Sequence, residues 1–143
     1  MEIEVITYSE IVERCKGDIR EILPDLPKED TREAWESFRD DLETIRDDSY
    51  CHASDGVQHW DWAIYPHYGI KILYGLPFDI ERQAEQEFFD LWGSESISTL
   101  NDAFDMASRI AMVALEITFR ETLEEMAQEL IEMAETQLEN LEF

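Results

Sequence analysis

Residues 100–143 read LNDAFDMASRIAMVALEITFRETLEEMAQELIEMAETQLENLEF, and this stretch decides the fold. It contains neither glycine nor proline, so no residue in it interrupts a helix. Placed at about 100° per residue, its polar positions up to Arg120 fall in a narrow arc, and nearly every other residue is apolar. Residues 99–119 are therefore predicted to form a central apolar helix that is buried on most sides.

The pattern changes after Arg120, where glutamates occupy one arc of an acidic, amphipathic C-terminal helix. These glutamates are Glu121, Glu124, Glu125, Glu129, Glu132, Glu135, Glu139 and Glu142. The polar face turns by about 140° between the two halves, and a single straight rod would be about 65 Å long. We therefore expect a kink or break between Thr118 and Thr122; failing that, the last helix protrudes and packs against a partner.

The N-terminal region predicts a short strand followed by a helix. Thr7 and Glu10 have the spacing of a capping box, apolar residues follow at helical intervals, and Pro24 and Pro27 end the helix. Residues 1–6 alternate acidic and apolar side chains, which allows a short edge strand, but a lone strand needs a partner.

A second helix is predicted from about Asp30 or Thr31 to about Asp48. Its polar face carries acids at intervals of three and four residues, namely Glu33, Glu36, Asp40, Glu43 and Asp47. Its flank carries an arginine every seven residues, at Arg32, Arg39 and Arg46. We therefore expect ion pairs to neutralise part of this acidic stripe.

The middle of the chain is the hardest part to assign. Residues 49–56 are predicted to be a loop, and the aromatic segment 59–78 is predicted to form two short helices about Pro66. Alternatively, residues 70–74 form a strand, or the whole segment is irregular. We expect the aromatic side chains of this segment to pack in the core rather than to form a recognition surface. Residues 79–92 predict another helix, with Ile80, Ala84, Phe88 and Leu91 as its buried positions.

Together these patterns predict a mainly all-α fold. We expect one acidic helical domain over residues 1–143, built as a compact bundle of five to six helices. The central apolar helix near 99–119 and the acidic C-terminal helix are its main features, with a short strand or an irregular segment at 59–78.

Charge is the main clue to function. The chain has 35 acidic and 11 basic residues, a formal charge of -24, yet 44% of it is hydrophobic, which excludes a disordered acidic tail. Direct nucleic-acid binding is disfavoured because it requires a basic surface, so a basic protein partner is expected. A salt-adapted surface is the competing explanation, but glutamate outnumbers aspartate and isoleucine is plentiful.

Neither a secreted nor a membrane protein is indicated. The chain shows no signal peptide and no long apolar span, so we expect a cytoplasmic location and no membrane partner. Cys15 and Cys51 define no disulfide framework, which agrees with a reducing compartment.

No motif predicts catalysis, a metal or a cofactor. The chain lacks Glu-x-x-His pairs, Gly-x-Ser-x-Gly, a glycine-rich phosphate loop and Cys-x-x-Cys. His52, His59 and His67 have spacings that match no standard zinc pattern. An enzyme would need the 59–78 region to bring histidines and acids into a deep pocket, so we predict a non-enzymatic binding protein.

The C-terminal acidic face is the predicted binding surface. Its glutamates have no lysine or arginine among them and provide about one charge per 4 Å of helix, close to the 3.4 Å rise per phosphate in one DNA strand. The alternative is a merely solvated face. Glu36, Asp40, Glu43 and Asp47 of the second helix form a possible second strip.

In size, charge, acidic helical faces and lack of catalytic motifs, the chain resembles the small acidic proteins with which phages and plasmids block host defence. These include DNA-mimic antirestriction and anti-CRISPR proteins. The resemblance involves no motif and carries over no residue. It implies an inhibitor that acts in the host cytoplasm on the basic nucleic-acid groove of a CRISPR effector or restriction enzyme. The alternative is a helical adaptor or antitoxin-like protein that binds through the apolar stripe of its C-terminal helix, and either reading allows a homodimer.

Overall fold

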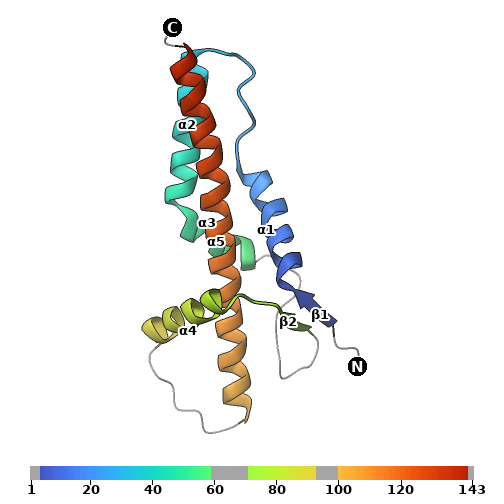
Figure 1. The fold of residues 1–143 in the computed structure, drawn as a ribbon. Helices are drawn as coiled ribbons and strands as arrows, with labels where there is room; N and C mark the ends of the chain where they lie inside the picture. The colour runs from blue at the N-terminus through green and yellow to red at the C-terminus, as the bar shows by residue number, and fades with distance from the viewer. Residues whose placement is uncertain (1–3, 59–70, 93–99, 142–143) are drawn as a thin grey trace.

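The computed structural model describes residues 4–58, 71–92 and 100–141, and within them it is mainly helical, as predicted. The described elements are β1 (Glu4–Thr7), α1 (Tyr8–Ile22), α2 (Arg32–Asp47), α3 (Ser49–Gln58), β2 (Lys71–Tyr74), α4 (Phe78–Trp92) and α5 (Leu100–Leu141). Helix α5 is the axis of the molecule and the other elements are arranged along it (Figure 1). None of the described helices is both long enough and apolar enough to cross a membrane.

Helix α5 runs for 42 residues without interruption, so the break predicted between Thr118 and Thr122 is wrong. The prediction assumed that both halves bury the same side. Instead α4 lies across the N-terminal half, whereas α1 and α2 run beside the C-terminal half (Figure 1). The apolar face can therefore change direction along a continuous helix, because each half packs against different neighbours. The C-terminal half also does not protrude alone, since α2 accompanies it.

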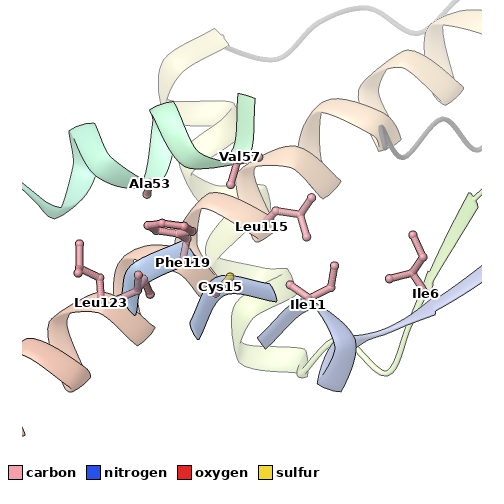
Figure 2. Close-up of a cluster of buried hydrophobic side chains, with 9 residues drawn as sticks. Ile6, Ile11, Cys15, Ala53, Val57, Leu115, Phe119 and Leu123 are labelled. Carbon is pink, nitrogen blue, oxygen red and sulfur yellow. The ribbon is translucent and has the colours of Figure 1, made fainter. Parts of the chain in front are cut away.

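The main core lies where α1, α3 and α5 meet, as Figure 2 shows. Phe119 of α5 is completely buried there, between Cys15 of α1 and Ala53 and Val57 of α3. Burial raises the pKa of the Cys15 thiol to about 12, so this cysteine serves as a small apolar side chain. The burial predicted for residues 99–119 is confirmed only for their last part: Ala114, Leu115, Ile117 and Phe119 are buried, whereas the described side chains between 106 and 113 are half-buried or exposed.

Two further clusters attach α2 and α4 to opposite halves of α5. Phe38 and Leu42 of α2 pack on Ile131 and Ala134 in the C-terminal half. The contact with α4 is separate, and its buried members are Ile80, Ala84, Ala114 and Ile117. These contacts anchor both halves of α5, although its N-terminal end extends past α4 (Figure 1).

Residues 49–56, predicted to be a loop, belong to helix α3. The backbone carbonyl of Asp48 accepts hydrogen bonds from the N–H groups of Cys51 and His52, which begins the helix directly after α2. Gly56, at the end of the predicted loop, has a packing role: a Cβ there would lie 2.7 Å from Cε2 of Phe119. The glycine lets α3 approach the ring of Phe119 closely. Local sequence patterns cannot predict this tertiary contact, because Phe119 is distant in the chain.

The N-terminal predictions agree with the structure. Thr7 caps α1 in a complete capping box with Glu10, and the chain leaves the helix at Ile22, before the two prolines. Strand β1 pairs in parallel with β2, in a register that places Val5 opposite Ile72. The first strand was expected to need a partner, and β2 is that partner. The alternative prediction of a strand over residues 70–74 is thus confirmed for the described residues 71–74. The two helices predicted about Pro66 lie outside the described residues.

One buried position of α4 was predicted wrongly. Ile80, Ala84 and Phe88 are buried, but the side chain of Leu91 is 75% exposed. Helical spacing assigns Leu91 to the inner face, but α4 crosses α5 rather than running along it (Figure 1). The last turn of α4 therefore reaches past the surface on which the earlier turns pack.

Candidate acidic binding surface

Six glutamates of the C-terminal half of α5 are exposed on one face, and we call them the α5 acidic strip. They are Glu121, Glu125, Glu129, Glu132, Glu135 and Glu139. Their positions span an arc of about 120° on the helix, opposite the buried residues that contact α1 and α2. The eighth predicted member, Glu142, lies outside the described residues.

The α5 acidic strip is not neutralised within the described part of the chain. None of its six carboxylates forms an ion pair there, and the sequence contains no lysine or arginine after Arg120. The contact made by a strip carboxylate is weak: Gln128 Nε2 donates to Glu132 Oε1 over 3.4 Å. From the helical rise, the strip is about 27 Å long and has one carboxylate per 5 Å or so.

Glu124, also predicted to belong to this face, has a structural role. The buried Ser49 hydroxyl donates to Glu124 Oε1 at 2.7 Å, joining the first residue of α3 to α5. This carboxylate is half-buried and already engaged, so it differs from its exposed neighbours. It positions α3 on α5.

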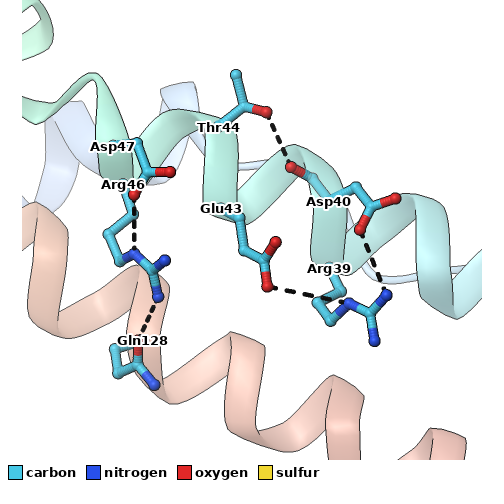
Figure 3. Close-up of polar contacts among 7 residues, drawn as sticks. All are labelled: Arg39, Asp40, Glu43, Thr44, Arg46, Asp47 and Gln128. Carbon is cyan, nitrogen blue, oxygen red and sulfur yellow. Dashed lines mark hydrogen bonds and ion pairs between the residues drawn. The ribbon is translucent and has the colours of Figure 1, made fainter.

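The arginines of α2 neutralise part of its acidic stripe, as predicted, through pairs at the expected spacing of four residues and through pairs between adjacent residues. Figure 3 shows Arg39 between Asp40, at 3.5 Å, and Glu43, at 4.0 Å. Arg46 lies 3.4 Å from Asp47. At the start of the helix, Arg32 Nε contacts Glu36 Oε1 at 3.0 Å.

Exposed pairs of this kind contribute little stability, but they cancel much of the local charge. The second predicted strip, formed by Glu36, Asp40, Glu43 and Asp47, is therefore much less negative than the first.

The two strips meet at a hollow of about 570 Å³ between α2 and α5. Its lining residues are Arg46, Asp47, Ser49, Tyr50, Glu121, Glu124, Glu125 and Gln128. Arg46 is fixed across the junction, because its Nη1 donates to Gln128 Oε1 at 2.7 Å (Figure 3). Asp47 and Glu121, at the end of the α5 acidic strip, line the same hollow, although they are 74 residues apart in the sequence.

A second hollow, of about 370 Å³, lies beside the first and shares Tyr50 with it. We call it the central crevice, and it is lined by Tyr50, Glu87, Asp90, Leu91, Val113, Glu116, Ile117 and Arg120. Sequence reasoning missed this site, because its residues come from three helices and only tertiary packing brings them together.

Arg120 organises the central crevice. Its side chain is 9% exposed, and its Nη2 lies 3.1 Å from Glu87 Oε2. Its guanidinium carbon also lies 4.0 Å from the centroid of the Tyr50 ring, a cation–π contact. The charge of this arginine is therefore already used inside the protein.

Glu116 is a half-buried acid in the same crevice. Burial raises the pKa of its carboxyl above the ordinary value of 4.5; Arg120 opposes this shift, and the negative charge of Glu87 adds to it. Among the described residues, Glu116 has no hydrogen-bond or ion-pair partner.

The apolar stripe of the C-terminal helix is engaged by the chain itself. Leu123, Ala127 and Leu138 are buried. Leu130 and Met133, which are half-buried, pack against the cluster that α2 forms with α5. The stripe on which the adaptor alternative depends is therefore largely occupied by intramolecular contacts.

Within the described residues, no three histidine, cysteine or acidic side chains lie in a position to hold a metal ion. His52 lies half-buried on α3, and the other two histidines fall outside the described residues. The chain matches no known protein family, and no curated protein or solved structure is detectably similar to it.

Proposed function

We propose that this protein is an acidic inhibitor that presents the α5 acidic strip to the basic nucleic-acid groove of a bacterial defence protein. The observation that carries this proposal is the unpaired state of the six exposed glutamates, on a helix that is packed along its opposite side. On α2, by contrast, each acid of the predicted strip lies next to an arginine.

The geometry of the strip suits a groove that normally holds one strand of DNA. Its length of about 27 Å corresponds to roughly eight nucleotides of a single strand at 3.4 Å per phosphate, against which it offers six carboxylates. Because α1 and α2 hold α5 in place, the backbone that carries the carboxylates is preorganised before binding. Such a line of charge accelerates association with a basic partner and makes it salt-dependent.

The adaptor alternative receives less support. Its binding residues would be the leucines and methionines of α5, and several of these form the core with α1 and α2. Exposing them to a partner would require α2 to leave α5. A substitution such as Leu138→Asp would consequently test the stability of the fold before it tested binding.

A pair of variants with equal net charge tests the proposal. The strip variant replaces all six glutamates of the α5 acidic strip with glutamine. The control variant replaces six exposed glutamates elsewhere, namely Glu13, Glu21, Glu29, Glu33, Glu81 and Glu85. Each variant removes six charges, so the formal charge changes from -24 to -18 in both.

Each immobilised variant is exposed to bacterial lysate at about 50 mM and about 500 mM salt, and the bound protein is identified and purified. We expect the wild type and the control variant to capture the same nucleic-acid-binding protein at low salt, and duplex DNA to displace it. The strip variant should bind it at least tenfold more weakly. Equal losses in both variants would assign binding to bulk charge, and salt-indifferent binding would refute the proposal.

A further inference from the structure

The central crevice combines an apolar floor with two large exposed side chains at its rim. Val113 and Ile117 of α5 line its floor. Leu91 of α4 and Tyr50 of α3 line it from the two other helices, and they are 75% and 65% exposed. Two such exposed hydrophobic residues around one hollow form an apolar contact surface that the described part of the chain does not cover.

The charged groups of the crevice are predominantly negative. Glu87, Asp90 and Glu116 contribute carboxylates, and Arg120 is the basic residue among the lining side chains. Arg120 is committed to Glu87 and to the ring of Tyr50. Glu116 makes no hydrogen bond or close ion pair among the described residues and is attracted by Arg120 only at longer range, so a bound cation would further stabilise its ionised form.

An occupant must match both properties. It needs an apolar stem that can lie against Val113 and Ile117 and a cationic head that can meet the carboxylates. A planar guanidinium fits better than an ammonium group, because it can bind a carboxylate through two parallel hydrogen bonds. The stem of an arginine side chain supplies the apolar contact.

We infer that the central crevice binds an arginine side chain of the protein partner, with its stem against Leu91, Val113 and Ile117 and its guanidinium at Glu116. This inference rests on the proposed function for the identity of the partner, because the crevice adjoins the end of the α5 acidic strip through Tyr50. The crevice provides a localised anchor, whereas the strip provides long-range attraction.

Small probes test the crevice without any partner. The full-length protein is titrated with n-butylguanidinium, which has both stem and head, and separately with guanidinium and with 1-butanol. Binding is followed by NMR of leucine, valine and isoleucine methyl groups. We expect n-butylguanidinium to shift the signals of Leu91, Val113 and Ile117 saturably, and to bind about tenfold more tightly than either fragment, because the stem buries several methylene groups.

Two variants and a matched control identify the site. Leu91→Ser removes an exposed rim contact and Glu116→Gln removes the proposed acceptor charge, and each should weaken n-butylguanidinium binding at least threefold. Leu141→Ser in α5 and Glu29→Gln, which precedes α2, change exposed residues that do not line the crevice, and both should leave binding unchanged. Equal affinities for n-butylguanidinium and guanidinium, or signal shifts spread along the α5 acidic strip, would overturn the inference.

The outcome is separable from that of the proposed function. None of the six glutamates changed in the strip variant lines the crevice. The strip variant should therefore still bind n-butylguanidinium. If this probe binds but no basic partner is captured, the crevice site stands and the inhibitor proposal fails. If the partner is captured but the probe does not bind, the crevice inference fails alone.

Discussion

The close approach of α3 to α5 makes Gly56→Ala an informative substitution. A Cβ at this position would lie 2.7 Å from Cε2 and 2.9 Å from Cζ of Phe119. The ring is completely buried in the cluster that joins α1, α3 and α5, so it cannot swing outward. Either the ring or α3 must therefore move.

Two effects compete in this variant. Alanine is favoured over glycine in a helix by at most about 1 kcal/mol. Adding a methyl group to a well-packed core costs about 1–3 kcal/mol. The cost of the added methyl group is larger here, because the distance from Cβ to the Phe119 ring would be shorter than van der Waals contact. We therefore expect Gly56→Ala to lower the free energy of unfolding by about 1 kcal/mol.

Gly17→Ala is the matched control. Gly17 is also a helical glycine, in α1, but it has no atom within 4 Å of the position of a Cβ. This variant should therefore gain about 0.5–1 kcal/mol from helix propensity alone. The two alanine variants should differ in stability by about 2 kcal/mol, with opposite signs relative to the wild type.

Urea denaturation monitored by circular dichroism measures both variants, and unchanged m-values would show that only stability changed. The double variant Gly56→Ala with Phe119→Leu should be more stable than the sum of its single changes, because the smaller side chain relieves the overlap. The reasoning would be refuted if Gly56→Ala stabilised the protein as much as Gly17→Ala does.

Three further predictions concern charge. Arg120→Met should destabilise the protein by about 1–3 kcal/mol because it leaves Glu87 without its cation, while the exposed Arg20→Met should change stability by no more than about 0.5 kcal/mol in thermal denaturation. Since folding raises the pKa of Glu116, the native state binds the proton of this carboxyl more tightly than the unfolded state does. The protonated carboxyl therefore adds to the free energy of unfolding below pH 4.5, and this stabilisation is lost as the pH rises through the folded pKa. Relative to wild type, Glu116→Gln should therefore gain stability in urea titrations between about pH 4 and pH 7, and a relative loss would contradict this sign. Raising the salt concentration from about 0.05 to about 0.5 M should raise the Tm, because it screens the repulsion of a formal charge of -24, and the strip variant should show a smaller rise; a salt-independent Tm would argue against strong self-repulsion.

The candidate site was only partly accessible from sequence. The acids after Arg120 could be recognised as unpaired because no lysine or arginine follows them in the sequence. The pairs of Arg32 with Glu36 and of Arg39 with Glu43 have the predicted four-residue spacing, whereas those of Arg39 with Asp40 and Arg46 with Asp47 join adjacent residues. The bond from Ser49 to Glu124 joins residues 75 positions apart, and no local spacing reports it. The central crevice was missed for the same reason.

The sequence by itself determined the helical class, the capping of α1 at Thr7 and the change of the apolar face between the two halves of residues 100–141. Caps and helical periodicity are local properties, so they can be identified without the tertiary structure. Only the tertiary structure decided that α5 stays unbroken. A change in the direction of the apolar face is equally compatible with a kink and with different neighbours on each half, and packing with α4, α1 and α2 selects the second. The same packing turned the glycine-containing segment 49–56 into α3 and left Leu91 exposed, since close approach and crossing geometry depend on residues distant in the chain.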